Sequence, residues 1–142
     1  MAHPVMYSDD DPGLAELREL CLGFPGAEEH VSHGRPTFRA GKIFACFGGS
    51  EKIRPGDHRQ VPSALIFKAD DVELPALDED DRFFVPAYYG PSGWRALDLA
   101  DPATDWAEVA ELVDTSYRSI ATRRLIEQLD ARESRDPRAT RG

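Results

Sequence analysis

The stretch 33-HGRPTFRAGKIFACF-47 carries the clearest strand-and-turn pattern in the chain. Its segments 37–40 and 43–47 are rich in aromatic and β-branched side chains, and Gly41 lies between them. Two runs of this kind on either side of a glycine turn predict a β-hairpin. The phenylalanines of the two runs then supply the buried face of that hairpin.

A second hairpin is predicted by 82-RFFVPAYYGPSGWRALDL-99. The aromatic run that starts at Phe83 and the run 94–99 flank a corner of glycines and a proline at 90–93, which is typical of a turn. Alternation along 94–99 places Trp94 on one face of the strand and Leu97 on the other. We expect Trp94 to be substantially buried.

Helical periodicity occurs near both ends of the chain. Leucines at helical spacing predict a helix over residues 12–23, with Asp11 as its N-cap and a proline in its first turn. The most regular period predicts a helix over residues 105–130 that is kinked near Ala121. Tyr117 lies on the apolar stripe of this helix, and we expect it to be buried.

The segments between these elements are less regular. Residues 28–32 and 63–68 are predicted strands, and the polar segment 48–62 is predicted to be either a surface loop or the tip of a long hairpin. The acidic segment 69–81 contains Pro75, which would break a continuous helix. A short or interrupted helix is therefore expected there.

Together these elements predict one α+β domain over residues 11–130. Its sheet is antiparallel, with about five or six strands, and its N- and C-terminal helices pack on one face. Residues 1–10 and 131–142 have no apolar period, so we expect both segments to be disordered. A chain of 142 residues can bury a core without a metal or a disulfide.

Charge is distributed unevenly along the chain, whose formal net charge is −9. Residues 33–59 contain six Lys or Arg and two Asp or Glu, whereas residues 1–32 contain one and seven, and residues 70–114 contain two and thirteen. The chain is therefore acidic with one basic segment. An overall field of this sign repels phosphate backbones and opposes non-specific binding to nucleic acid.

Several motifs occur in a specific order and spacing. They are LCLGFPGAEE at 20–29, HGRPTF at 33–38, GKIFA at 41–45, a strand that ends at Lys68, PAYYGPSGW at 86–94 and DWAEVAELVDTSY at 105–117. Together they resemble the MmcQ/YjbR family of small bacterial proteins, over roughly residues 14–126. The resemblance implies an antiparallel sheet packed on one side by helices, akin to the frataxin-like topology. It also implies a double wing of two hairpins, for which DNA binding has been proposed in the family.

The first functional hypothesis follows from this resemblance: weak, salt-dependent DNA binding through the basic first hairpin. Contacts to phosphates weaken as the salt concentration rises. The second hairpin lies between acidic segments, so we expect the contact from one wing only. The cations that would make it are Arg35, Arg39, Lys42, Lys52, Arg54 and Arg59.

The alternative hypothesis is a regulator that binds a protein or a small ligand at an aromatic corner, without nucleic acid. Glycines and prolines shape this corner, and a shallow groove between the sheet and the C-terminal helix would hold the ligand. Packing in the core or at its rim is the competing interpretation of the same aromatic side chains. The groove residues are Lys68, Tyr88, Tyr89, Trp94, Arg95 and Tyr117.

The remaining reactive side chains form no catalytic or metal-binding pattern. The four histidines are not spaced as metal ligands, and we expect no metal, no cofactor and no enzymatic activity. Cys21 and Cys46 have apolar neighbours and are expected to fill the core as free thiols. The sequence shows neither an apolar run of membrane-spanning length nor a secretory signal, so we expect a monomeric cytoplasmic protein.

Overall fold

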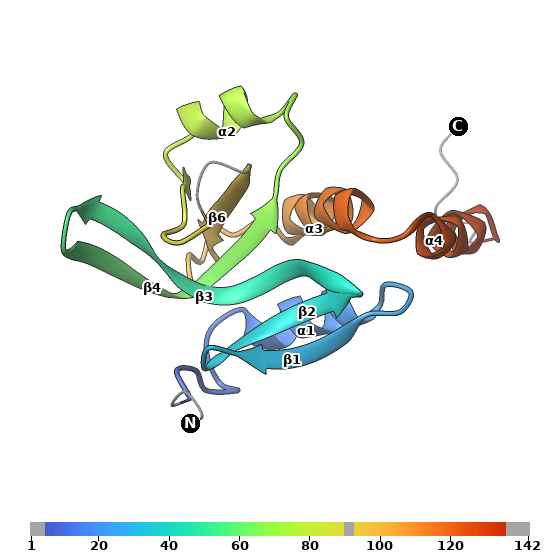
Figure 1. Ribbon diagram of the computed structural model, residues 1–142, viewed down its shortest axis with the longest axis horizontal. Helices are drawn as coiled ribbons and strands as arrows, with labels where there is room; N and C mark the ends of the chain where they lie inside the picture. Colours follow the sequence, from blue (N-terminus) through green and yellow to red (C-terminus); the bar gives the residue numbers. More distant parts are fainter. Residues whose placement is uncertain (1–4, 90–92, 136–142) are drawn as a thin grey trace.

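The computed structural model describes residues 5–89 and 93–135. In these residues, six strands form one antiparallel sheet in the order β1-β2-β3-β4-β6-β5 (Figure 1). The strands are β1 (Glu28–Ser32), β2 (Arg35–Ala40), β3 (Lys42–Arg54), β4 (Asp57–Lys68), β5 (Phe83–Phe84) and β6 (Trp94–Asp98). The helices are α1 (Leu14–Leu22), α2 (Leu74–Glu79), α3 (Trp106–Ile120) and α4 (Arg123–Arg135). This arrangement confirms the α+β fold class.

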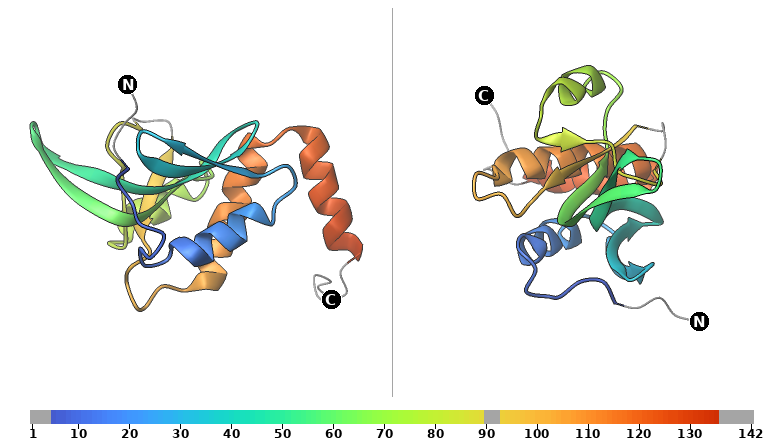
Figure 2. Two further views of the ribbon diagram at one scale, coloured as in Figure 1. Left: turned by 90° about the horizontal axis from the view of Figure 1, so that it is seen from below. Right: turned by 90° about the vertical axis from the view of Figure 1, so that its left-hand side faces the viewer.

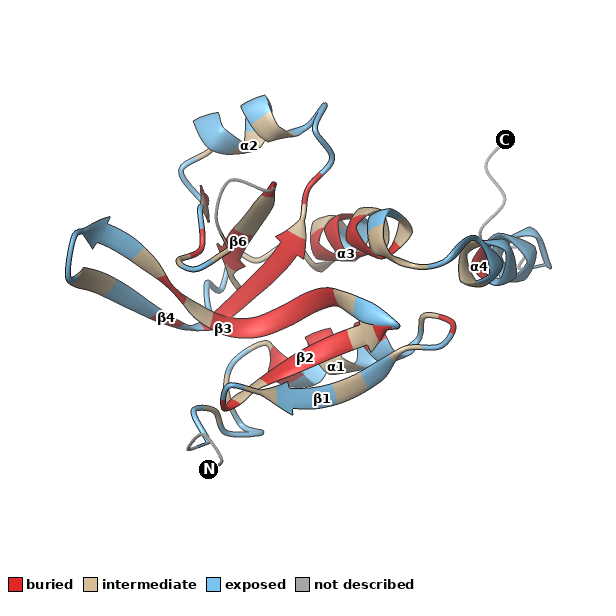
Figure 3. Ribbon diagram, in the orientation of Figure 1, coloured by how far each residue is buried: buried red, intermediate tan, exposed pale blue. Residues whose placement is uncertain are grey.

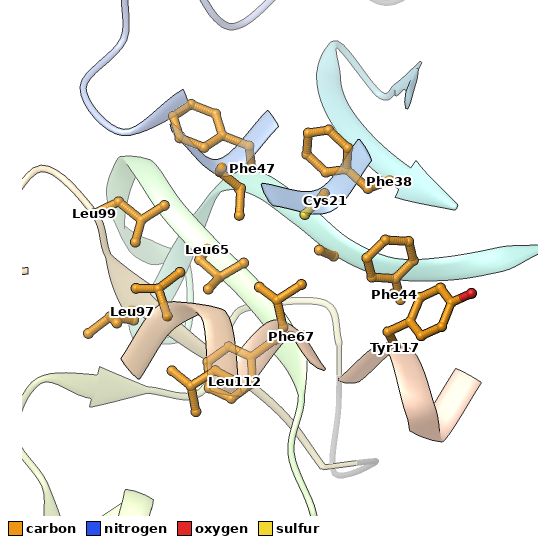
Figure 4. Close-up of a cluster of buried hydrophobic side chains, with 14 of the residues drawn as sticks. Cys21, Phe38, Phe44, Phe47, Leu65, Phe67, Leu97, Leu99, Leu112 and Tyr117 are labelled. Atoms are coloured by element: carbon orange, nitrogen blue, oxygen red, sulfur yellow. The ribbon is translucent and has the colours of Figure 1, made fainter. Parts of the chain in front are cut away.

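Helices α1 and α3 lie next to each other on the same side of the sheet (Figure 2). Their apolar stripes and the strand residues that face them form the main core (Figure 4). Tyr117 of α3 is fully buried, as predicted, and its hydroxyl donates a 2.6 Å hydrogen bond to the Pro25 carbonyl oxygen. Its ring stacks on Phe24 and meets Phe44 edge-on. This aromatic group anchors α3 to the sheet and to the end of α1.

The other side of the sheet carries a second, smaller apolar cluster. All members of this cluster come from strands or from the segment 84–89, and we call this side the open face. Its buried members are Cys46, Val61, Ala64, Ile66 and Ala96, with Ile43, Phe84, Tyr89 and Trp94 packed against them.

A bulge in β3 links the sheet to α3. The register of β2 and β3 skips Phe44, which makes Phe44 the extra residue of a β-bulge. Its carbonyl oxygen accepts a 2.6 Å hydrogen bond from the buried Ser116 hydroxyl, which itself accepts one from the Lys68 amide at 2.9 Å. Because of the extra residue, Ile43 and Cys46 both face the open side.

The polar segment 48–62 belongs to a long β3–β4 hairpin, so of the two interpretations the hairpin tip is right and the loop is wrong. The register of the two strands shifts beside Gly48, whose φ of 87° lies in the left-handed region. Pro62 of β4 lies at the same shift and has no amide hydrogen, so it cannot donate a hydrogen bond to β3. The arm beyond this shift projects from the sheet, and its tip is exposed (Figure 3).

The predicted helix over residues 105–130 is divided into α3 and α4. Ala121 is extended, with a ψ of 157°, and the Thr122 hydroxyl oxygen accepts a hydrogen bond from the Leu125 amide. The expected kink is a break because Thr122 caps a new helix. Residues 131–135, expected to be disordered, belong to α4, while residues 136–142 lie outside the described chain.

The N-terminal region also differs from prediction. Helix α1 begins at Leu14 because Gly13, with a φ of 86°, cannot continue a helix. The Asp11 carboxylate instead accepts a 2.9 Å hydrogen bond from the Ser8 amide, in the turn before α1. Residues 5–10, also expected to be disordered, are placed in the structure; the Met6 amide donates a 2.9 Å hydrogen bond to the Gly34 carbonyl oxygen. Residues 1–4 lie outside the described chain.

The second predicted hairpin is present as β5 and β6, which pair Phe83 with Leu97. Its corner at 90–92 lies outside the described residues. Trp94 is only half-buried, a correction to the expected substantial burial, because it packs against the small cluster of the open face and not within the main core. Helix α2 is the short helix expected in the acidic segment, and Pro75 stands in its first turn. None of the helices described is long and apolar enough to cross a membrane.

Candidate functional site

A cavity of about 650 Å³ opens on the open face of the sheet. This volume is within the range of roughly 300–1,000 Å³ that small-molecule sites occupy. Strands β2 to β4, the β1–β2 turn, the hairpin arm and the segment 87–89 all contribute to the wall. The lining residues are Met6, Ser32, His33, Arg35, Thr37, Ile43, Cys46, Gly48, Gly49, Ser50, His58, Gln60, Ile66, Ala87, Tyr88 and Tyr89.

One wall of this cavity comes from a segment that leaves β5 and crosses to β3. The Ala87 amide donates a 2.8 Å hydrogen bond to the Ser50 carbonyl oxygen, and Pro86 forms a β-bridge with Glu51. These contacts are made to the part of β3 that lies beyond its pairing with β2. They hold the next two residues, both tyrosines, at the open face.

Arg35 is the only Lys or Arg among the described residues that line the cavity. Its guanidinium lies across Gly48, where an added Cβ would collide with Nη1. Nη1 is buried and has no hydrogen-bond partner among the residues that the structure describes. A buried donor without an acceptor costs about 1–3 kcal/mol, and more when the group is charged. The structure therefore contains a charged donor that an anion would satisfy.

Tyr89 and Cys46 form a buried pair beside Arg35. The Tyr89 hydroxyl donates a 3.2 Å hydrogen bond to the Cys46 sulfur. Burial raises the pKa of the Cys46 thiol to about 11, although the Tyr89 hydrogen bond and the charge of Arg39 lower it. Burial also raises the pKa of Tyr89, and the charge of Arg35 opposes that shift. Both groups are therefore protonated near neutral pH.

The mouth of the cavity contains two residues with unusual backbone angles. His33 and Tyr88 have φ values of 53° and 74°, a region that bulky residues rarely adopt. The Tyr88 ring stacks on His58 with centroids 5.6 Å apart and planes 12° apart, yet 87% of Tyr88 remains exposed. The angle of His33 belongs to the two-residue β1–β2 turn, whose second residue, Gly34, also has a positive φ of 80°. Tyr88 is the bulky residue in this region, and such residues concentrate at functional sites.

The electrostatic character of this cavity is opposite to that of the whole chain. None of its described lining residues is Asp or Glu, although the chain has 26 of them and a formal net charge of −9. A second cavity, of about 690 Å³ between α2 and α3, shows the contrast. Its lining includes four carboxylates, Glu73, Glu108, Glu111 and Asp114. The open-face cavity is thus a local site for negative charge in an acidic protein.

The chain matches the family model described as YjbR over residues 22–119. It belongs to the YjbR family. The YjbR region runs from the end of α1 almost to the end of α3, so it includes all six strands of the sheet described above. A search of curated proteins finds no match to the chain.

In this YjbR protein, the six cations proposed for DNA binding lie in two groups along the sheet. Arg35 and Arg39 are half-buried in β2, and Lys42 is exposed at the start of β3. The other three lie near the tip of the β3–β4 hairpin: Lys52, Arg54 and Arg59. Because β3 is 13 residues long, Lys42 and Arg54 are up to about 40 Å apart along the strand.

The arginines near the hairpin tip are already paired with carboxylates. Arg54 lies 3.1 Å from Asp57, and Arg59 lies 2.9 Å from Glu51 and also over the ring of Phe84. These pairs reduce the positive charge that the tip offers to a phosphate backbone.

The structure also separates the six residues proposed for the aromatic groove. Tyr88 and Tyr89 line the open-face cavity, and Trp94 packs against Tyr89 with ring centroids 5.6 Å apart. Four of the six do not line the cavity: Lys68, Trp94, Arg95 and Tyr117. Arg95 pairs with Asp78 at 2.7 Å, and Tyr117 belongs to the main core on the other side of the sheet.

Sequence reasoning assigned Arg35 and the two tyrosines to different sites, and the structure brings them to one cavity. The sequence-based hypotheses also left out several polar residues that line the cavity: Ser32, His33, Thr37, Ser50, His58 and Gln60. One available signal was the alternation of His58 and Gln60, which would place both on one face of a strand. The described residues contain no group of three His, Cys, Asp or Glu placed to hold a metal ion.

Proposed function

We propose that this protein is a non-enzymatic, cytoplasmic binding protein that holds a small anionic ligand in the open-face cavity, with Arg35 as the anchor. The observation that carries the proposal is the buried Arg35 Nη1, which has no acceptor among the described residues. An oxyanion beside this nitrogen would supply the missing acceptor. Hydrogen bonds between a guanidinium and a carboxylate or phosphate are among the stronger ones in proteins.

The shape of the site supports a small ligand rather than a polymer. Nη1 is covered, so an anion reaches it only when a neighbouring side chain moves. A ligand small enough to enter this cavity avoids the acidic segments that would repel a long polyanion.

The protonation states around the cavity favour binding over catalysis. The Cys46 thiol has a pKa of about 11, so almost none of it is thiolate at neutral pH. A thiol acts as a nucleophile through its thiolate. The hydrogen bond between Cys46 and Tyr89 therefore serves as a neutral, structural contact beside the charged Arg35.

Thermal unfolding in the presence of anions tests the proposal. Sodium acetate, sodium benzoate and sodium phosphate are each titrated against the wild-type protein, with sodium chloride as the ionic-strength control. At least one anion should raise Tm saturably; a ligand at a hundred times its Kd stabilises by about 2.7 kcal/mol. Arg35→Gln should remove this response, and Arg54→Gln, at the hairpin tip, should keep it.

Two results would contradict an anion site at Arg35. The first is a wild-type protein whose Tm responds to each anion no more than to chloride. The second is an Arg35→Gln variant that responds as the wild type does. Circular dichroism of each variant verifies its fold, so that a lost response is not confused with unfolding.

DNA binding through the first hairpin is the competing hypothesis, and the family resemblance supports it. At low salt, replacing Arg35, Arg39 and Lys42 together with Ala should abolish any duplex binding and flatten its salt dependence. The paired arginines at the hairpin tip and the acidic flanks lead us to expect no binding at physiological salt. Tight, salt-resistant and sequence-selective binding that survives the triple change would refute both our placement and our electrostatic argument.

A further inference from the structure

We infer that the ligand of the open-face cavity is an aromatic carboxylate, whose carboxylate binds Arg35 and whose ring stacks on the Tyr88–His58 pair. This inference rests on the proposed anion site and adds the chemical class of the ligand. Three features of the cavity carry it: its single permanent cation, the apolar part of its lining and its stacked aromatic mouth.

The charge of the lining favours a ligand with one negative charge. Arg35 is the only Lys or Arg among the described lining residues, and no carboxylate among them opposes it. A phosphate monoester carries nearly two negative charges near neutral pH, and a nucleoside triphosphate carries more. One guanidinium matches one carboxylate, because its planar fork can donate two parallel hydrogen bonds.

Part of the cavity lining is apolar. Ile43 and Ile66 come from the small core cluster of the open face, and Met6 is the third large apolar side chain in the lining. Ile66 is already buried, so the apolar surface that a ligand can still cover belongs to the exposed Met6 and the half-buried Ile43. A ligand with a hydrocarbon ring would remove that surface from water, which is favourable at about 25 cal/mol per Å² of buried apolar surface, whereas a carboxylate alone would leave it uncovered.

The mouth of the cavity provides a flat surface. The rings of Tyr88 and His58 are nearly parallel, with planes 12° apart, and both residues line the cavity. Tyr88 holds a left-handed backbone angle while 87% of it stays exposed, so burial of its own side chain does not explain the strain. A ligand ring would stack on the exposed Tyr88 side chain, because aromatic pairs attract each other beyond the area they bury.

The inference is tested by isothermal titration calorimetry with four probes of similar size or charge. Benzoate has the ring and the charge, cyclohexanecarboxylate has the charge and a saturated ring, benzamide has the ring without the charge, and acetate has the charge alone. We expect benzoate to bind roughly tenfold more tightly than cyclohexanecarboxylate, and more tightly still than acetate, since stacking on an aromatic side chain is worth about this factor. Benzamide should not bind measurably.

Two variants locate the recognition of the ring. Tyr88→Leu keeps an apolar side chain and should weaken benzoate binding roughly tenfold, to the level of cyclohexanecarboxylate, while acetate binding stays unchanged. Because Tyr88 is exposed, this variant is expected to fold, and circular dichroism verifies it. Arg54→Gln is the matched control outside the cavity and should bind all four probes as the wild type does.

Each other outcome is decisive. If acetate binds as tightly as benzoate and both need Arg35, the anion site stands and the aromatic inference fails. If benzamide binds as tightly as benzoate, the ring is recognised without the carboxylate and the inference fails. If no probe binds, and phosphate also fails, both the inference and the proposed function are wrong. Unchanged benzoate affinity in Tyr88→Leu would overturn the stacking contact.

Discussion

Replacing Gly48 with Ala tests the position of Arg35, on which the proposed site depends. Two separate costs are expected. Gly48 has a φ of 87°, and a residue with a Cβ is strained in this region by about 1–2 kcal/mol. The added Cβ would also collide with Arg35 Nη1 and lie 3.0 Å from the Pro62 carbonyl oxygen. Overpacking of this kind typically costs a further 1–3 kcal/mol or so.

Gly56→Ala is the matched control. Gly56 has a φ of 79° in the same hairpin, but a Cβ added there would meet no atom within 4 Å. It should therefore show the backbone cost alone, about 1–2 kcal/mol, whereas Gly48→Ala should lose about 2–5 kcal/mol. Urea denaturation followed by circular dichroism measures both values, and benzoate titration of Gly48→Ala should show lost affinity.

A double-mutant cycle identifies the cause of the difference. In an Arg35→Gln background the collision at Nη1 is gone, and only the contact with Pro62 should remain in addition to the backbone cost. We expect a coupling free energy of about 1–2 kcal/mol between the two positions. Two results would show that Arg35 does not lie across Gly48 and that the proposed site is wrong. One is a Gly48→Ala variant that loses no more stability than Gly56→Ala. The other is an extra loss of stability in Gly48→Ala that stays the same when Arg35 is replaced.

Four further predictions concern the core and the cavity. Tyr117→Phe should cost about 1–3 kcal/mol in urea denaturation, because it leaves the Pro25 carbonyl oxygen buried without its hydroxyl donor; an unchanged midpoint would mean that water replaces the hydroxyl. Trp94→Ala should cost about 2–3 kcal/mol, less than the 3–5 kcal/mol typical of a fully buried aromatic, because Trp94 is half-buried; a loss below about 1 kcal/mol would mean that its packing on the open face contributes little. Cys46 should react with iodoacetamide at pH 8 roughly a hundredfold more slowly than a free thiol, because its pKa of about 11 leaves little thiolate. Tyr89→Phe should raise the pKa of Cys46 further, since it removes a hydrogen bond that lowers it, and mass spectrometry across a pH series would show the opposite shift if this sign is wrong.

Elements with strong side-chain periodicity were predictable from the sequence. The first hairpin, the pairing of β5 with β6 and the helical stripe through Tyr117 all depend on residues close together in the chain. In α3 one face is buried and the other is exposed, so the period of apolar residues reports the structure directly. The hairpin strands are marked instead by runs of aromatic and β-branched residues on either side of a turn. The family resemblance adds the order of these elements, and the match over residues 22–119 confirms it.

Elements without a buried face were harder to predict. The arm of the β3–β4 hairpin beyond Gly48 is held by backbone pairing, and much of its surface is exposed, so its polar residues show little alternation. The sequence predicted a kink near Ala121 and not the full break between α3 and α4, because the apolar period continues on either side and the break depends on one capping residue, Thr122. Backbone hydrogen bonds form with almost any side chain, so such features leave a weak trace in the sequence.

The cavity is the feature that depends most on backbone contacts that the sequence does not reveal. The amino-acid sequence established that Arg35 belongs to a basic strand and that Tyr88 and Tyr89 lie beside a glycine-rich corner. Only the folded chain joins them, because the Ala87 amide pairs with the Ser50 carbonyl oxygen and carries the tyrosines across the open face. That contact is between two backbone groups 37 residues apart, and backbone groups are the same in every residue type but proline. The sequence shows which residue types are present, but their proximity in the site depends on a backbone contact that side chains do not encode.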